Sequence, residues 1–378
     1  MMKICLVTST RAEYGIMNNL IKKLSLDKDI CFRLCVTGSH LCPKYGYTRK
    51  YIDLDNKYID EIDIVKGSDD VSNIFSNSIL EFDGYFKKNK FDIVILLGDR
   101  YEIFAIASIA YINKIKIAHI HGGENTYGAL DEQFRHCITK LSNIHFPSCE
   151  KYRDRIIQMG EMPSTVFNVG SLSVENIMNM KFRPLNELNK KYNFQLNNYA
   201  MVTFNPVTSK KDNGVGELLE LVRSLTQYDY ELLILYPNMD SGNNEIIQIL
   251  NNIKTNKTYV IKSLEYLDYL SFASYSSLFI GNSSSGIIEI PSLNVPIINV
   301  GERQSGRESS KKVISCEANY DSICNAIEYI NNSSYYENEF KEKNIYQGND
   351  TSNIIINKIK EYISSNITTK IFYDFEVK

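Results

Sequence analysis

The sequence contains no tryptophan and only five histidines in 378 residues. It also lacks a CxxC pair, a Gly-Lys dipeptide and a GxGxxG stretch. These absences exclude a P-loop and disfavour a nicotinamide-dependent enzyme, because both use those glycine patterns to hold phosphate groups. The eight cysteines are scattered, mostly within apolar runs, which is typical of reduced core thiols rather than of a disulfide framework.

Charge and hydrophobicity exclude two further kinds of partner. The net charge of −3 gives no electrostatic reason to expect a nucleic acid or a membrane surface. No apolar run reaches the roughly 18–20 residues that would span a bilayer. The apolar run near the N-terminus, residues 4–7, is too short for the core of a signal peptide. We therefore expect a cytoplasmic protein that binds neither membranes nor nucleic acids.

What the sequence does contain is a regular alternation of apolar strand-like runs and helix-like segments. The first half predicts strands at 3–8, 31–37, 92–97, 115–120 and 165–169, and helices at 12–26, 71–87, 101–112, 131–142 and 150–159. The second half predicts strands at 201–204, 231–235, 258–261, 277–280 and 296–300, and helices at 216–225, 245–253, 265–273 and 322–330. Runs of Val, Ile and Leu without polar alternation indicate parallel sheets covered by helices on both faces.

A polar segment rich in Asn and Lys, at 180–198, separates the two series. We therefore predict an α/β protein with two doubly wound Rossmann-like domains, at 1–178 and 179–360. The aromatic residues of the tail at 361–378 indicate that it docks on the protein. Ligands of such sheets bind beyond the carboxyl ends of the strands, so we expect the site in a cleft between the two domains.

The stretch GNSSSGIIE at 281–289 is a candidate phosphate site, because it directly follows an apolar strand. A helix that begins near Gly286 would offer free N–H groups and the positive end of its dipole. The candidate contacts are Asn282, Ser283, Ser284, Ser285, Gly286 and Glu289, the last as an acceptor for ribose hydroxyls. The alternative is a Ser-rich helix cap without a ligand.

Four arginines follow strand ends or lie in a glycine-bearing loop, namely Arg11, Arg100, Arg303 and Arg307. Their guanidinium groups match pairs of pyrophosphate oxygens. An ordinary surface position is the alternative for any single one of them, but their shared position at strand ends favours an anionic ligand.

Acidic residues follow the central strands of the first half. Asp99 comes directly after a buried strand, where it is either a catalytic or ligand-binding group or the cap of the next helix. Glu124 and Asp131 follow the next strand along the chain. A simple i,i+4 ion pair between Asp131 and Arg135 is the alternative to a catalytic role.

Histidines gather in the same region. His119 and His121 lie on one face of a predicted strand, since side chains alternate along it. They could take part in acid–base chemistry or substrate binding, fill structural roles, or bind zinc together with His136.

These motifs, in this order, resemble the UDP-N-acetylglucosamine 2-epimerases, and more closely the hydrolysing branch used in sialic, legionaminic and related nonulosonic acid synthesis. The matching stretches are TSTRAEYG (8–15), GDRYEIFAIA (98–107), HIHGGE (119–124), DEQFRHCITKLSNIHF (131–146), GNSSSGIIEIPSL (281–293) and GERQSGR (301–307). They cover nearly the whole chain. HIHGGE and the stretch that begins DEQFRH carry the assignment to the branch.

The resemblance implies a glycosyltransferase-B-like fold with UDP bound against the second domain. It implies nucleotide contacts from Arg11, Ser283, Ser284, Glu289 and Arg307, a substrate contact from Arg100, and catalysis by Asp99 and Asp131. Two positions depart from many relatives, which have Glu in place of His121 and His in place of Asn205. We expect His121 and Glu124 to complete the catalytic set, whereas Asn205 offers the substrate only hydrogen bonds.

The expected reaction is the conversion of UDP-N-acetylglucosamine to UDP and N-acetylmannosamine. UDP would leave by anti elimination, and the resulting 2-acetamidoglycal would then be hydrated, without a cofactor or a metal. By resemblance, the enzyme is expected to be a homodimer or homotetramer. UDP-N,N′-diacetylbacillosamine is an alternative substrate, and a non-hydrolysing epimerase, a sugar transferase on the same fold and a His/Glu metallohydrolase are alternative activities.

Overall fold

The computed structural model describes residues 1–68, 70–126, 130–207, 210–237, 243–253, 257–365, 367 and 369–374. The chain forms two compact units. Unit 1 comprises Met1–Asn176 and Gly348–Lys378, and unit 2 comprises Ile177–Gln347. No helix in the described parts of the chain is both long and apolar enough to cross a membrane.

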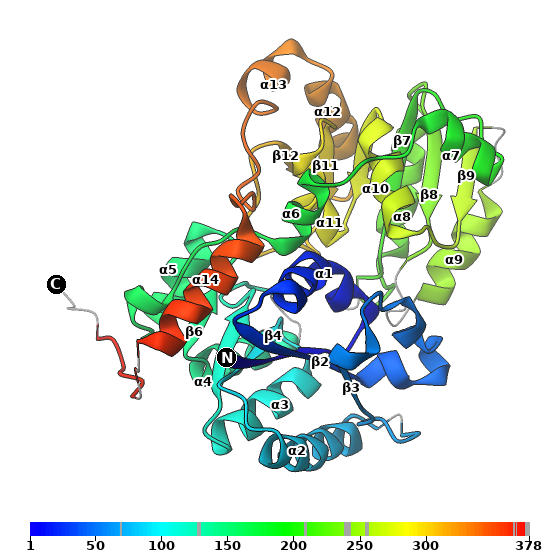
Figure 1. Cartoon of the computed structure of the whole chain (residues 1–378). Helices are drawn as coiled ribbons and strands as arrows, with labels where there is room; N and C mark the ends of the chain where they lie inside the picture. Colours follow the sequence, from blue (N-terminus) through cyan, green and yellow to red (C-terminus); the bar gives the residue numbers. More distant parts are fainter. Residues whose placement is uncertain are drawn as a thin grey trace. The chain divides into compact units, whose positions relative to one another are not determined.

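Unit 1 is built on a six-stranded parallel sheet with the order β3-β2-β1-β4-β5-β6 (Figure 1). Its strands are β1 (Met2–Thr8), β2 (Ile30–Thr37), β3 (Ile59–Ile62), β4 (Ile93–Leu97), β5 (Lys116–Ile120) and β6 (Ile144–Phe146). Every residue of β4 is buried, as expected for a central strand covered on both faces.

Helices cover both faces of this sheet. They are α1 (Arg11–Leu26), α2 (Val71–Lys88), α3 (Tyr101–Ile112), α4 (Asp131–Leu141), α5 (Glu150–Gln158) and α14 (Thr351–Ser364). Helix α6 (Leu172–Met178) begins in unit 1, and its last two residues belong to unit 2. The apolar sides of α1 and α14 pack with one face of β1 and β2, and those of α2 and α3 pack with the other face. Short 3-10 turns connect β2 to β3, the first being η1 (Gly38–Leu41).

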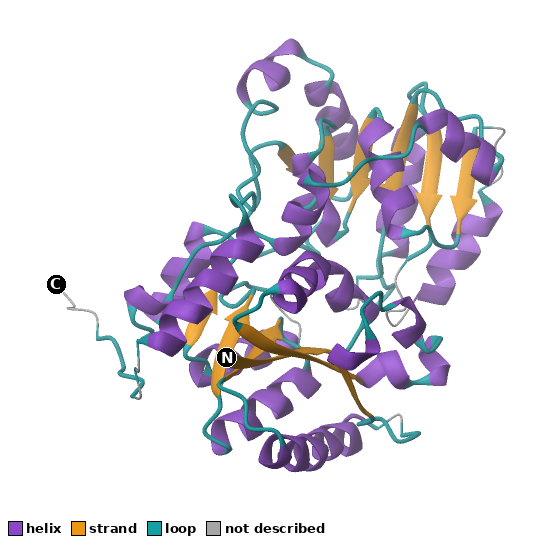
Figure 2. Cartoon of the chain, viewed as in Figure 1, coloured by secondary structure: helices purple, strands orange, loops and turns teal. Residues whose placement is uncertain are grey.

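Unit 2 contains a second parallel sheet, whose strands are drawn as orange arrows in Figure 2. It has six strands, in the order β12-β11-β10-β7-β8-β9. Its strands are β7 (Tyr199–Thr203), β8 (Glu231–Leu235), β9 (Thr258–Ile261), β10 (Leu278–Gly281), β11 (Ile297–Val300) and β12 (Val313–Cys316). Its helices are α7 (Leu185–Tyr192), α8 (Val215–Leu225), α9 (Asn243–Asn252), α10 (Tyr266–Tyr275), α11 (Ser284–Ile288), α12 (Tyr320–Ile330) and α13 (Ser333–Asn338).

Both sheets have the same topology. Counted from the first strand of each unit, the order is 3-2-1-4-5-6, which is that of a doubly wound dinucleotide-type fold. The order reverses between β1 and β4 in unit 1 and between β7 and β10 in unit 2. Ligands of such sheets bind at this switch point, so ligand-binding residues are expected in the loops after these four strands.

Most predicted elements lie within a few residues of the observed ones, but the predicted strand at 165–169 is wrong. That segment begins in a 3-10 turn, Pro163–Thr165, and only Val166 forms a bridge, to His145. The sixth strand of unit 1 is instead β6, a three-residue strand too short to stand out in the sequence. The structure also contains β3 and β12 and helix α7, which the sequence analysis does not predict.

The predicted domain boundary at residue 360 is also wrong, because residues from Gly348 onward belong to unit 1. The reason is the apolar face of α14, whose Ile355 and Ile359 are fully buried in the core shared with α1. The tail beyond α14 stays on the same unit, where the Tyr373 N–H donates a hydrogen bond to the carbonyl oxygen of Gly160 at 2.9 Å. Phe375, part of the aromatic tail motif, lies outside the described residues.

Candidate active site

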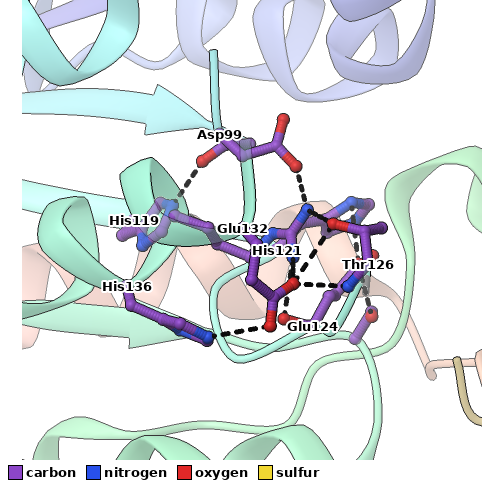
Figure 3. A network of polar contacts seen from close by, with 10 residues as sticks. Asp99, His119, His121, Glu124, Thr126, Glu132 and His136 are labelled. Atoms are coloured by element: carbon purple, nitrogen blue, oxygen red, sulfur yellow. Dashed lines mark hydrogen bonds and ion pairs between the residues drawn. The ribbon is translucent and has the colours of Figure 1, made fainter. Parts of the chain in front are cut away.

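Asp99 lies just beyond the carboxyl end of β4, and Figure 3 shows the polar network around it. The chain leaves the strand through Gly98, whose φ of +82° favours glycine. The Asp99 carboxylate accepts a hydrogen bond from a terminal nitrogen of Arg135, with which it forms an ion pair. Part of the Asp99 side chain remains exposed, so this carboxylate is anchored and still accessible to a ligand.

Arg135 is the centre of this network although it is only 1% exposed. Besides Asp99, it donates to the backbone oxygen of Glu124 at 2.8 Å and to the carboxylate of Glu132 at 3.2 Å. Within the described parts of the chain, no ion pair joins it to Asp131, so the alternative of a simple i,i+4 pair is wrong. The guanidinium points from α4 into the buried end of the sheet instead of along the helix surface.

Asp131 is the first residue of α4, in a turn where the helix dipole favours a negative charge. Its pKa is nevertheless raised, first by loss of solvent around the carboxyl group and then by the nearby negative charge of Asp99. Arg100 and Arg135 oppose this shift. A carboxyl group with a raised pKa therefore lies near the Asp99 carboxylate at this end of the sheet, an arrangement found in many acid–base sites.

His121 and Glu124 lie in the loop that follows β5, in the same network. His121 has a left-handed backbone (φ 64°), and its N–H donates to the carbonyl oxygen of Phe146 at 3.0 Å. Its Nδ1 atom lies 3.7 Å from Oε1 of Glu124, and both side chains are largely buried. A strained backbone that aims a histidine at a carboxylate is a common feature of functional loops.

His119 has a structural role. Its Nε2 donates to the carbonyl oxygen of Gly98 at 2.8 Å, and Nδ1 contacts the Thr139 hydroxyl at 3.1 Å. Burial lowers the pKa of His119 to about 3, so the ring is neutral. Both nitrogens are occupied, and the described residues contain no cluster of His, Cys, Asp and Glu arranged to hold a metal ion.

A second acidic cluster, which the sequence analysis missed, lies where β1 and β4 meet α1 and α3. Ser9, Glu13 and Glu102 are buried here, and the Arg100 Nε donates to Glu102. Burial and the charge of Glu102 raise the pKa of Glu13 to about 7. The only signal in the sequence is an acid in the first helical turn after each strand, a position also typical of ordinary helix starts. Arg11, also at this end, is exposed and lies over the Tyr51 ring at 4.5 Å.

In unit 2, the side-chain amide of Asn282 links the loops that follow β7 and β10. Asn282 accepts a hydrogen bond from the Asn205 N–H at 2.7 Å and donates to the Asn205 carbonyl oxygen at 2.8 Å. The backbone oxygen of Asn282 in turn accepts from Arg303 at 3.3 Å and from Gln304 at 2.9 Å. The Asn282 side chain therefore holds the loop after β7 in place. Arg303, which follows β11, fixes the backbone of Asn282 through its hydrogen bond. Thr208, the last residue of the NPVT stretch, lies outside the described residues.

The start of α11 places the serine-rich motif beyond β10. Ser283 is the N-cap, and its hydroxyl oxygen accepts from the Ser285 N–H at 3.4 Å. Glu289 accepts from the Ser285 hydroxyl at 2.6 Å and from the Tyr266 hydroxyl at 2.9 Å. Burial raises the pKa of Glu289.

The remaining candidates of unit 2 lie close to this motif in the chain. Ser284 is the first residue of α11, and Gly286 packs against the ring of Phe279, where an added Cβ would come within 3.1 Å. Arg307 follows β11, in a turn closed by a hydrogen bond from its N–H to Gln304 at 3.1 Å. Unit 2 thus presents hydroxyl, amide and guanidinium groups at the carboxyl ends of its strands, and unit 1 presents carboxylates.

Comparison with known proteins gives a consistent result along the whole chain. A family model described as UDP-N-acetylglucosamine 2-epimerase matches residues 22–360. The chain is 37% identical over 386 residues to the polysialic acid biosynthesis protein P7 of Escherichia coli, covering 99% of this chain and 98% of that protein. It is 35% identical over 344 residues to the GDP/UDP-N,N′-diacetylbacillosamine 2-epimerase (hydrolyzing) of Campylobacter jejuni, covering 89% of each.

Among solved structures, one similar chain is the UDP-GlcNAc 2-epimerase of Neisseria meningitidis bound to UDP-GlcNAc. The TM-score is 0.80 at 19% identity, with 95% of this chain and 100% of that chain covered. At that identity the likeness concerns the fold, and it confirms the predicted α/β class with two doubly wound sheets.

Proposed function

Because the chain belongs to the UDP-N-acetylglucosamine 2-epimerase family, we propose that it is a hydrolysing 2-epimerase. Its substrate would be UDP-N-acetylglucosamine, and its products UDP and N-acetylmannosamine. The similarity to a relative named as a hydrolysing 2-epimerase, over 89% of both chains, supports the hydrolysing branch.

In the proposed reaction, a base removes the proton from C2 of the sugar while the bond from C1 to the diphosphate oxygen breaks. These electron shifts give UDP and a 2-acetamidoglycal with a C1–C2 double bond. Water then adds its hydroxyl to C1, and a proton returns to C2 from the opposite face, which inverts that carbon. Two acid–base groups are therefore required, one for each face.

The pairing of Asp99 with Asp131 supports this proposal best. Asp99 accepts a hydrogen bond from the buried Arg135, while the pKa of Asp131 is raised, first by loss of solvent and then by the charge of Asp99. One carboxylate that accepts a proton and one carboxyl group that more readily carries a proton are what the two-step reaction needs. We assign acid–base roles to both, with His121 and Glu124 beside them.

We propose that unit 2 binds the nucleotide. The serine-rich start of α11, Arg303 and Arg307 would receive the diphosphate, and Glu289 would accept hydrogen bonds from the ribose hydroxyls. Stabilising the departing diphosphate matters because the C2 proton is only weakly acidic, so the leaving group must share the work of the elimination.

The test is incubation with UDP-N-acetylglucosamine in D₂O, with NMR of the products. We expect free UDP and a free 2-epimer that carries deuterium at C2. A released 2-epimer without deuterium would contradict the elimination mechanism, and a product that keeps its UDP would indicate a non-hydrolysing epimerase.

A parallel incubation with UDP-N,N′-diacetylbacillosamine addresses the alternative substrate, which the Campylobacter jejuni relative carries in its name. The chemistry at C1 and C2 is the same for both sugars, so only the relative kcat/KM values distinguish them. A higher value for the diacetylated sugar would assign the enzyme to legionaminic rather than sialic acid synthesis.

A further inference from the structure

The acidic cluster of Ser9, Glu13, Arg100 and Glu102 has more contacts than the available hydrogens can satisfy. The Ser9 hydroxyl oxygen lies 3.1 Å from Oε1 of Glu13 and 2.9 Å from Oε1 of Glu102. A serine hydroxyl carries one hydrogen, so it can donate to only one of these two carboxyl oxygens. The other contact becomes a hydrogen bond only if a carboxyl group itself carries a proton and donates it to the Ser9 oxygen.

The surrounding contacts show which carboxyl group this is. Oε1 of Glu102 already accepts from the Arg100 guanidinium, so its place in the cluster is that of an acceptor. Arg100 Nε lies farther from Glu13, at 4.0 Å from its Oε1. Every contact is a hydrogen bond when a protonated Glu13 donates to the Ser9 oxygen and the Ser9 hydroxyl donates to Glu102. Arg100 also donates to Glu102. The other oxygen of Glu13 accepts from the Ser9 N–H at 2.7 Å.

Charge balance leads to the same arrangement. Glu13 and Glu102 are 6% and 3% exposed, and two buried anions beside a single cation would leave one charge uncompensated. One proton makes the cluster neutral. Consistent with this count, burial and the charge of Glu102 raise the pKa of Glu13 to about 7, although the Ser9 and Arg100 contacts oppose the shift.

Among the described residues, the neighbouring elements bring no charged group to Glu13 besides Arg100 and Glu102. Glu13 is on α1, and the groups that face it are Ser9 from the β1 end and Arg100 and Glu102 from the start of α3. The 3-10 turn η1 packs on the same loop through the Ser39 N–H, which donates to the Ser9 carbonyl oxygen. That turn carries His40, which is neutral near pH 7 because burial lowers its pKa to about 4.

Arg100 connects this cluster to the candidate site. It directly follows Asp99, and its side chain is 43% exposed. Its Nε is tied to Glu102, whereas in the described parts of the chain no hydrogen bond engages its two terminal nitrogens. Those nitrogens are available to an anionic ligand, and their attraction for it depends on how many negative charges lie behind them.

We propose that Glu13, Ser9 and Glu102 form a one-proton relay that positions Arg100 and keeps its cluster neutral, so that Arg100 can bind the diphosphate of the substrate. This assignment rests on the proposed function for the identity of the anion. When Glu13 loses its proton, the cluster gains a negative charge and repels the diphosphate. These three are positioning residues, because they act through Arg100.

The test uses the full-length enzyme and the substitution Glu13→Gln. A glutamine amide can donate to the Ser9 hydroxyl and accept from the Ser9 N–H, so it copies the protonated glutamate but cannot ionise. For the wild type we expect KM for the UDP-sugar to rise roughly tenfold between pH 6 and pH 8.5, with kcat following a separate profile. For Glu13→Gln we expect KM to stay level over that range.

Two further variants complete the comparison. Glu13→Ala removes the donor to Ser9 and cannot ionise, so we expect its KM to be raised roughly tenfold already at pH 6 and then to stay level up to pH 8.5. Glu175→Gln is the matched control, since Glu175 is another buried glutamate of unit 1 that accepts a backbone N–H, from Ser352 at 3.0 Å. It should keep the wild-type KM profile.

A second measurement needs no substrate. In protein labelled with ¹³C at the glutamate carboxyl groups, the resonance missing from Glu13→Gln belongs to Glu13, and it should titrate with a midpoint near pH 7. A midpoint below pH 5, or a KM of Glu13→Gln that rises with pH as in the wild type, would overturn the relay. If no UDP-sugar is turned over, the proposed function fails, and calorimetric UDP affinity across pH replaces KM as the test of the relay.

Discussion

The two units have the same strand order, yet opposite chemistry joins their switch points. Between β1 and β4, Ser9 and two buried glutamates make the link, with Arg100 as their only cation among the described residues. Between β7 and β10, a neutral amide makes the link, with Asn282 clasping both backbone groups of Asn205. In the proposed relay the acidic junction responds to pH, whereas the amide junction contains no group that titrates.

This difference follows from what each unit has to hold. A neutral clasp fixes a loop without adding negative charge next to a bound diphosphate, which suits the unit assigned to the nucleotide. Carboxyl groups with separated pKa values suit the unit assigned to proton transfer. The shared topology therefore provides two equivalent positions, and the residues placed there divide the task.

We expect the largest effect from Asp99→Asn, which tests whether unit 1 carries out the proton transfer. An amide cannot act as a base and cannot form the ion pair with Arg135, so we expect kcat to fall about 10³-fold. UDP affinity should change far less than kcat, because the groups of unit 2 and Arg100, which are proposed to contact the diphosphate, are all retained. The measurement is steady-state kinetics with calorimetric binding of UDP.

The matched control for that prediction is Asp92→Asn. Asp92 lies just before the opposite end of the same strand, where its carboxylate accepts the Lys3 N–H at 2.8 Å. Its replacement should leave kcat within about twofold of the wild type, since it stands away from the carboxyl ends of the strands. Equal losses in both variants would mean that the effect of Asp99→Asn is structural.

The amide junction is tested by Asn282→Ala. The substitution removes two hydrogen bonds, from the Asn205 N–H and to the Asn205 carbonyl oxygen, and we expect the free energy of unfolding to fall by about 2–3 kcal/mol. The loop also carries the Arg303 contact, so UDP should bind roughly tenfold more weakly. Urea unfolding and calorimetry measure the two effects.

Asn299→Ala provides the control in the neighbouring strand. Asn299 is buried at the end of β11, but among the described residues its side chain makes a single hydrogen bond, a long one of 3.4 Å to the Ser315 hydroxyl. Removing it should cost less than about 1 kcal/mol, because no well-formed hydrogen bond is lost. A similar cost for both asparagines would argue against a special role for the Asn282 clasp.

The fold was largely predictable from the sequence because buried parallel strands read as continuous apolar runs. The elements that escaped prediction are those without such a signal. β6 is three residues long, and α7 lies in the polar segment that was read as a break between domains. α14 has an ordinary amphipathic pattern, but no local pattern indicates which of the two cores it joins.

The site was less predictable, because its key contacts join residues far apart in the chain. Asp99 and Asp131 stand out by position, but the partner of Asp99 is Arg135, 36 residues away. Glu13 and Glu102 are 89 positions apart and look like ordinary first-turn acids. Only the packing of α1 and α3 against the same pair of strands makes them a buried pair.

The smallest expected effect is the contribution of His119 to the pH dependence of stability. A histidine in an HxH pair was open to catalytic, structural and zinc-binding interpretations, and the structure shows a neutral ring that ties β5 to the loop before Asp99. Its pKa of about 3 lies below the ordinary value of 6.5, so the unfolded chain binds more protons between these values. The stability that His119 contributes is therefore present above pH 6.5 and is lost as the pH falls toward 3.

We accordingly expect the free energy of unfolding of unit 1 to fall with acid by up to about 1.4 kcal/mol per pH unit from this residue alone. Glutamine does not titrate, so in His119→Gln the slope of the free energy of unfolding against pH should lose the contribution of one proton. This expectation does not depend on how the substitution changes absolute stability. Urea unfolding at a series of pH values between 6.5 and 4 measures that slope. An unchanged slope in His119→Gln would mean that the ring gains its proton at the same pH in the folded and the unfolded chain, which would contradict a buried, neutral His119.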